Sequence, residues 1–173
     1  MKTYLRVLLL LFFCPAWSLG QGMVSESAVK AAFIYNFIKF VEWPANTLPT
    51  GHIRLCLVGH DDKLQVAIEQ MVGKEAQGRI LEIANVQRSD LPGNCQVLVI
   101  SSNEDRVAEI LRMVGEAPKL TISDAADFID DHGMIGLNSV DHKVQFDINV
   151  NSARRAHLKI SAQLLKLARR VVQ

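Results

Sequence analysis

The residues of this 173-residue chain that are best suited to binding chemistry lie near its C-terminus: Arg154, Arg155 and His157. They follow residues 149–152 (NVNS), which end an apolar segment and are typical of a helix start. Backbone donors at a helix start and two guanidinium groups suit an anion. Because ligands of α/β proteins often lie at the carboxyl ends of strands, this group is a candidate small-molecule or partner site. A solvated basic patch is the other interpretation.

Cysteine chemistry depends on Cys56 and Cys95, because Cys14 falls in a segment that we expect to be removed. In an oxidising compartment, two cysteines indicate one intrachain disulfide. The closed loop of about 40 residues would contribute roughly 4 kcal/mol. Two buried free thiols are the alternative. A nucleophilic Cys56 is disfavoured, because it lies within a predicted strand and no elbow glycine follows it.

Other enzyme and metal signals are weak. The chain has no GxSxG, HExxH, CxxC, P-loop or GxGxxG motif. No two of its five histidines are spaced two or four residues apart, so a metal site would need ligands from distant segments. We therefore expect no catalytic residues, no metal and no cofactor.

Residues 1–20 have the pattern of a secretory signal peptide. Lys2 and Arg6 precede an unbroken apolar run, residues 7–13, and small residues follow at cleavage spacing. The run is short for a membrane span. We expect cleavage near residues 20–22 and an exported, periplasmic protein. An uncleaved anchor and a lipoprotein are alternatives, although Phe13 before Cys14 disfavours the lipoprotein.

The remaining residues, 21–173, are enough for one domain with a sizeable core. The whole chain has 19 Lys and Arg against 18 Asp and Glu, and removal of Lys2 and Arg6 leaves 17 against 18. This balance gives no reason to expect nucleic-acid binding.

Helix-like and strand-like segments alternate along the domain. We expect strands at residues 53–58, 79–86, 96–100, 119–122, 133–137 and 143–148. We expect helices at residues 25–43, 64–72 and 103–114, a short one after residue 123, and one from residue 151 onward. This order predicts an α/β fold, a three-layer α/β/α sandwich whose sheet is mainly parallel, with an antiparallel edge hairpin near the C-terminus.

Several stretches together resemble the YfiR family of exported bacterial regulators. They are residues 29–44 (VKAAFIYNFIKFVEWP), 55–59 (LCLVG), 94–100 (NCQVLVI), 120–124 (LTISD), 133–135 (GMI), 146–149 (FDIN) and 160–168 (ISAQLLKLA). The resemblance covers essentially the whole exported domain, in order.

This resemblance implies regulation without catalysis. YfiR-like proteins are periplasmic, and the best understood kind inhibits a membrane-bound diguanylate cyclase by binding its periplasmic sensor domain, which lowers cyclic di-GMP and biofilm formation. The resemblance also implies a homodimer and places Cys56 and Cys95 at a family disulfide position. Some relatives have a second cysteine pair where this chain has Asp130, Asp131 and His132.

The C-terminal segment is the candidate partner or dimer interface, because its predicted helix is apolar on one side and basic on the other. Leu164, Lys166 and Arg169 represent these two sides. The apolar helix face of Phe33, Phe37 and Phe40 is interpreted as core. A periplasmic sensor that binds a small anion, without a cyclase partner, is the second functional hypothesis, and a secreted enzyme is the third.

Overall fold

The computed structural model describes residues 24–91, 93–141 and 143–173, so the predicted signal peptide, residues 1–20, lies outside the described residues. Within these ranges, eight strands form the main sheet, in the order β10-β8-β7-β6-β5-β2-β4-β3. They are β2 (His52–Val58), β3 (Glu75–Ala76), β4 (Arg79–Asn85), β5 (Val97–Ile100), β6 (Leu120–Ser123), β7 (Ile135–Val140), β8 (Lys143–Asn149) and β10 (Arg170–Val172). Two further short strands, β1 (Val41–Glu42) and β9 (Lys159–Ile160), pair with each other.

The predicted fold class is confirmed. Strands β4, β2, β5, β6 and β7 are parallel, and β8 returns antiparallel beside β7. The antiparallel pair near the C-terminus is therefore present, but a strand that the sequence did not predict, β10, lies outside it and runs parallel to β8.

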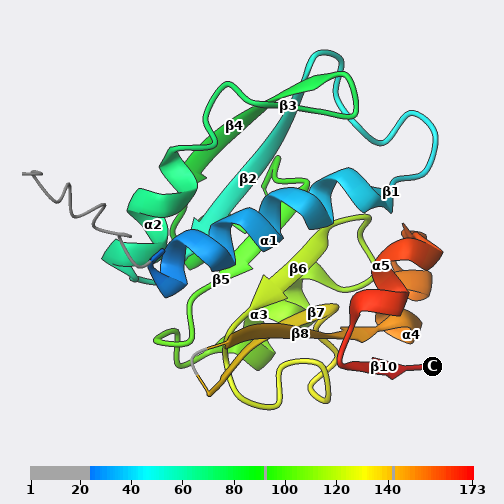
Figure 1. Cartoon of the computed structure of the whole chain (residues 1–173). Coiled ribbons are helices and arrows are strands. Elements are labelled where there is room, and N and C mark those ends of the chain that lie inside the picture. The colour runs from blue at the N-terminus through cyan, green and yellow to red at the C-terminus, as the bar shows by residue number, and fades with distance from the viewer. Residues whose placement is uncertain (1–23, 92, 142) are drawn as a thin grey trace, which may run out of the picture.

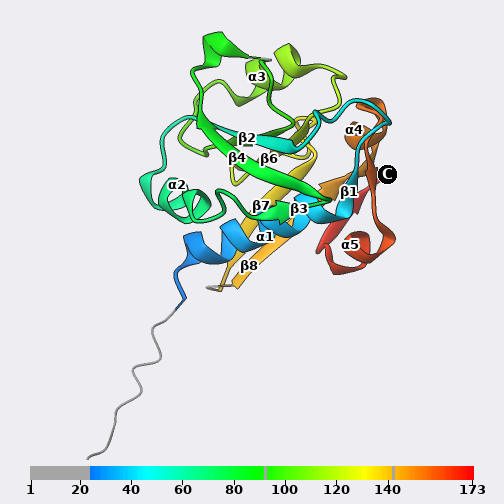
Figure 2. The same ribbon diagram turned by 90° about the horizontal axis from the view of Figure 1, so that it is seen from above.

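Helices cover both faces of the sheet and make three layers. One face carries α1 (Glu26–Phe40), α2 (Asp62–Glu69) and α5 (Ala162–Leu167), and the other carries α3 (Val107–Val114) (Figures 1 and 2). A short helix, α4 (Val150–Arg155), follows β8 at one end of the sheet (Figure 2).

Helix α1 begins and ends where its sequence directs. The Ser25 hydroxyl accepts a hydrogen bond from the Ala28 backbone N–H, at 3.2 Å. The helix ends before Trp43 and Pro44, where proline disfavours further helix. Phe37 is fully buried, and Phe33 and Phe40 pack partly buried against the same cluster, so the core interpretation of this face is confirmed.

The prediction of one helix from residue 151 onward is wrong. The chain instead forms α4, β9, α5 and β10 in succession. His157, with φ +57°, ends α4 in the left-handed region, and the Ser161 side chain caps α5 by accepting from the Leu164 backbone N–H. The predicted short helix after residue 123 is also absent from the described chain, which makes turns there.

The second core layer, beneath α3, contains a disulfide between Cys56 and Cys95. The two Cα atoms are 5.8 Å apart, and both residues are almost fully buried. The bond joins β2 to the segment that leads into β5. Lys119 Nζ holds the same segment by donating to the carbonyl oxygens of Gly93 and Cys95, each at 2.7 Å.

Replacing both cysteines, Cys56→Ala/Cys95→Ala, is expected to leave a folded protein whose free energy of unfolding is lower by about 4 kcal/mol, because the unfolded chain regains loop entropy. Urea denaturation of the oxidised wild type and the double variant measures the difference. The wild type with reductant is the control and should approach the variant. Equal denaturation midpoints for the oxidised wild type and the variant would contradict a structural role.

Candidate functional site

The carboxyl edge of the parallel strands is the first place to look for a ligand, because connections leave β2 and β5 in opposite directions there. In this protein the edge is closed. Gly59 follows β2 so tightly that a Cβ on it would lie 3.0 Å from the Ser101 Cβ. The carbonyl oxygen of His60 accepts hydrogen bonds from Ser101 Oγ and Asn103 Nδ2. The cavity that remains is about 10 Å³, room for roughly one water.

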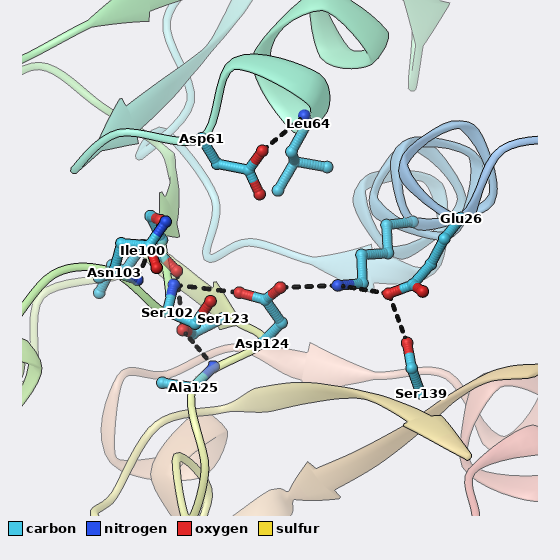
Figure 3. Close-up of polar contacts among 12 residues, drawn as sticks. Glu26, Asp61, Leu64, Ile100, Ser102, Asn103, Ser123, Asp124, Ala125 and Ser139 are labelled. Carbon is cyan, nitrogen blue, oxygen red and sulfur yellow. Dashed lines mark hydrogen bonds and ion pairs between the residues drawn. The ribbon is translucent and has the colours of Figure 1, made fainter. Parts of the chain in front are cut away.

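An ion-pair chain fills the adjoining part of this edge (Figure 3). Asp124 accepts from the Ser102 backbone N–H at 3.1 Å and from Lys30 Nζ at 2.7 Å. Lys30 also contacts Glu26 at 2.9 Å, and Glu26 accepts from the Ser139 hydroxyl. Burial alone would lower the pKa of Lys30, but the bonds and charges of Asp124 and Glu26 outweigh it and raise that pKa. These groups bind one another and fasten α1 to the sheet.

The predicted basic residues Arg154, Arg155 and His157 lie at the opposite end of the sheet, after β8. Because β8 runs antiparallel, its carboxyl end points away from the edge just described and toward the amino ends of β5 and β6. Asn149 caps α4 by accepting from the Ser152 backbone N–H at 2.9 Å. Because α4 has only six residues, Arg154 and Arg155 are its fifth and sixth residues and form its last turn.

One cavity of about 700 Å³ lies between α3, α4 and the acidic segment of residues 124–134. This volume is in the usual range for small-molecule sites. Arg155 on α4 and Arg112 on α3 both line it, and Leu111 and Met134 supply apolar wall. Arg154 and His157 are exposed and lie outside its lining. The structure therefore brings only one of the three predicted basic residues into the cavity.

The two arginines of the cavity lack acidic partners within the described residues. Arg155 Nη2 donates to Ser152 Oγ at 2.9 Å, which orients the guanidinium group and leaves its other donors free. Arg112 has no hydrogen bond or ion pair there, whereas Arg54, Arg106, Arg169 and Arg170 are each paired with a carboxylate. Sequence reasoning missed Arg112, because nothing in its spacing relates it to Arg155.

The acidic segment forms the third wall. Gly133 packs against Phe128 so closely that a Cβ would lie 2.3 Å from the ring. Asn149 Nδ2 donates to the Ile129 carbonyl oxygen at 2.7 Å, and Asp130, which lines the cavity, accepts from Arg170 Nη2 at 2.7 Å. The segment is thus attached both to β8 and to the C-terminal strand.

A buried carboxylate, Asp147, organises that strand. Its side chain is 4% exposed and accepts from Arg169 Nε at 2.8 Å, from Arg169 Nη2, and from Asn138 Nδ2 at 3.2 Å. Arg170 Nε lies 3.8 Å away. Burial would raise the pKa of Asp147, but the two arginines and the Asn138 amide outweigh it and lower the pKa. The same contacts raise the pKa of Arg169.

The three residues of the predicted interface have different surroundings. Leu164 is 3% exposed and packs in the core, because the short α5 turns it toward α1. Arg169 is held by Asp147, and Lys166 is exposed. The exposed apolar residue of α5 is Leu167, at 68%. Lys166 and Leu167 are therefore exposed enough to contact another protein, whereas Leu164 is buried and is not.

Comparison with solved structures agrees with this architecture. A conserved domain protein from Vibrio cholerae O1 biovar El Tor superposes with a TM-score of 0.58 at 10% sequence identity. The match covers 85% of this chain and 60% of that one, so this chain spans about three fifths of that protein's length. At this identity the likeness shows the fold alone.

The family is defined by the sequence match. Residues 27–169 match the YfiR/HmsC-like family, and the chain belongs to that family. Membership supports a periplasmic regulator in cyclic di-GMP signalling, and the family is regulatory rather than catalytic.

No helix within residues 24–91, 93–141 and 143–173 is long and apolar enough to span a membrane. Over the same ranges, no group of three His, Cys, Asp or Glu side chains is arranged to hold a metal ion.

Asp147→Asn is expected to lower the free energy of unfolding by about 2 kcal/mol at pH 7, because Arg169 loses its carboxylate while remaining half exposed to solvent. The pKa of Asp147 is lower in the folded protein than in the unfolded chain. The ionised carboxylate therefore contributes fully to the free energy of unfolding above the unfolded-state pKa, and this contribution is lost as the pH falls below about 4. Chemical denaturation between pH 7 and pH 3 should therefore show a smaller acid loss in Asp147→Asn.

The matched control is Asp131→Asn, because Asp131 is exposed and has no ion pair among the described residues. This variant should keep the wild-type pH dependence. An Asp147→Asn profile that runs parallel to the wild type down to pH 3 would refute the depressed pKa.

Proposed function

We propose that this protein is exported to the periplasm and inhibits an inner-membrane diguanylate cyclase by binding the cyclase's periplasmic sensor domain, which lowers cyclic di-GMP and biofilm formation. The observation that carries the proposal is family membership over residues 27–169, nearly the whole domain. The predicted signal peptide, residues 1–20, supports export.

The arrangement of the domain favours recognition of a protein over chemistry on a substrate. The edge at which α/β enzymes usually bind substrates is occupied by the protein's own ion pairs, with Lys30 between Glu26 and Asp124. The C-terminal segment has basic residues and one exposed leucine, Leu167, on the surface. Such a mixed apolar and basic surface suits a protein partner.

A second function, the sensing of a small anion, is favoured by one observation. The cavity of about 700 Å³ places Arg112 and Arg155 on two of its walls, and neither arginine is paired with a carboxylate in the described chain, although Glu116, Asp130 and Asp131 also line the cavity. Asp130 at the same cavity bonds Arg170 of β10, so a ligand could affect the C-terminal strand. The ligand would then tune the inhibition.

Deletion of the gene is expected to raise cellular cyclic di-GMP several-fold, because the cyclase would be relieved of its inhibitor. Quantification of cyclic di-GMP by mass spectrometry, in cells that express the cyclase, measures this. Complementation with the full chain should restore the low level, and complementation without residues 1–20 should not. Unchanged cyclic di-GMP in the deletion strain would contradict the inhibitor role.

Anionic metabolites are expected to raise the melting temperature of the mature protein if the cavity binds them, and Arg155→Ala should remove that shift. Thermal-shift screening of mono- and dicarboxylates and phosphate esters provides the measurement. Arg154→Ala is the control, because Arg154 lies outside the cavity and should keep the shift. A shift that survives Arg155→Ala, or no shift from any anion, would remove this second function.

A further inference from the structure

The outer side of β8 is open over residues 143–145. Strand β10 pairs with β8 only at Asp147, Ile148 and Asn149. Before that point, the Arg169 backbone N–H bonds the Phe146 carbonyl oxygen. No other strand of the described chain borders this side of β8. The sheet therefore ends here in a short free edge.

The direction of the free backbone groups follows from the pairing. In an antiparallel pair, successive residues direct their N–H and C=O groups alternately toward and away from the partner strand. The Phe146 carbonyl points outward to Arg169, so Val144, two residues earlier, also points its N–H and C=O outward. Unpaired edge groups of this kind are a template for an added strand.

An apolar groove lies beside this edge. It has a volume of about 340 Å³ and lies between α1, β8 and the end of α5. Its lining consists of Phe33, Val144, Gln145, Phe146, Leu167 and Arg169. Leu167 is 68% exposed, and Phe33, which packs against Phe37 and Phe146, is only partly buried, so both present apolar surface to the groove. The groove is large enough for one or two bulky apolar side chains.

The charge around the groove selects the kind of partner. Lys143 and Lys166 are the chain neighbours of the lining residues Val144 and Leu167, both lysines are exposed, and neither has an acidic partner in the described chain. Residues 151–173 contain six basic residues and no acidic one. A second copy seated edge to edge would bring the unpaired Lys143 and Lys166 of two copies together, which is unfavourable. A partner segment with a carboxylate would neutralise them.

We propose that the β8 edge and the adjacent groove, together the β8 docking site, accept an extended segment of a partner protein. The segment pairs its backbone with Val144, inserts a large apolar side chain between Phe33 and Leu167, and carries an acidic residue that meets Lys143 or Lys166. Only the identity of the partner, the periplasmic domain of the cyclase, rests on the proposed function.

Binding of the purified periplasmic domain of the cyclase to the mature protein provides the first test. Leu167→Glu should weaken binding at least tenfold, because it places a charge in the groove. Val144→Pro should do the same, since it removes an outward N–H that bonds nothing within the sheet. The control Val66→Glu changes another exposed apolar residue, 58% exposed against 68% for Leu167, on α2 over the opposite half of the sheet, and should alter binding less than twofold.

A photoreactive residue at position 167, compared with one at position 66, identifies the occupant in intact cells. An adduct from position 167 alone, mapped by mass spectrometry to an extended acidic and apolar segment of the cyclase, supports both proposals. An adduct to such a segment of another periplasmic protein supports the docking site and overturns the cyclase as partner. An adduct only to a second copy, equal adducts from both positions, or unchanged binding by folded Leu167→Glu would overturn the docking site.

Discussion

The C-terminal third of the molecule depends on one buried carboxylate. Asp147 lies on β8 with its side chain almost out of solvent, and a charge in that position is tolerable only when it is paired. Arg169 and Arg170 provide the pairing, and both belong to the segment that becomes β10. Because these two arginines pair with Asp147, the last strand, β10, is held beside β8. Arg170 extends the same contacts to Asp130, so the wall of the large cavity depends on them as well.

The places where this protein could bind a ligand or a partner do not lie at the carboxyl edge of the parallel strands, where α/β folds usually bind ligands. Asp124, Lys30 and Glu26 close the carboxyl edge, and they fix α1 as they do so. The reversal of β8 carries the chain to the other end of the sheet, where the cavity with Arg112 and Arg155 lies. The short β10 leaves part of the β8 edge uncovered beside Leu167. The cavity and the open edge share no lining residue, because the cavity lies beyond the carboxyl end of β8 and the open edge lies at its amino end.

Sequence reasoning identified the features that depend on local pattern. Apolar runs such as residues 97–100 predicted the strands, and the two cysteines of residues 21–173 predicted the disulfide that joins β2 to the β5 segment. The succession of short elements in place of one C-terminal helix was not predictable, because Leu164, Leu167, Ala168 and Val171 have the i, i+3, i+4, i+7 spacing of a helix. What breaks it is nonlocal: β9 pairs with β1, and β10 is held at Asp147. The cavity was missed for the same reason, since its walls come from three distant segments.

Recovery of the partner from membranes tests the central claim most directly. The bait is the mature, oxidised protein, incubated with detergent-solubilised membranes of the native cells, with Leu167→Glu as a parallel bait. The account predicts that the wild type recovers a membrane-bound diguanylate cyclase with a periplasmic domain and that the variant recovers much less. Absence of any such cyclase from the wild-type bait, with the protein folded and the Cys56–Cys95 bond intact, would contradict it.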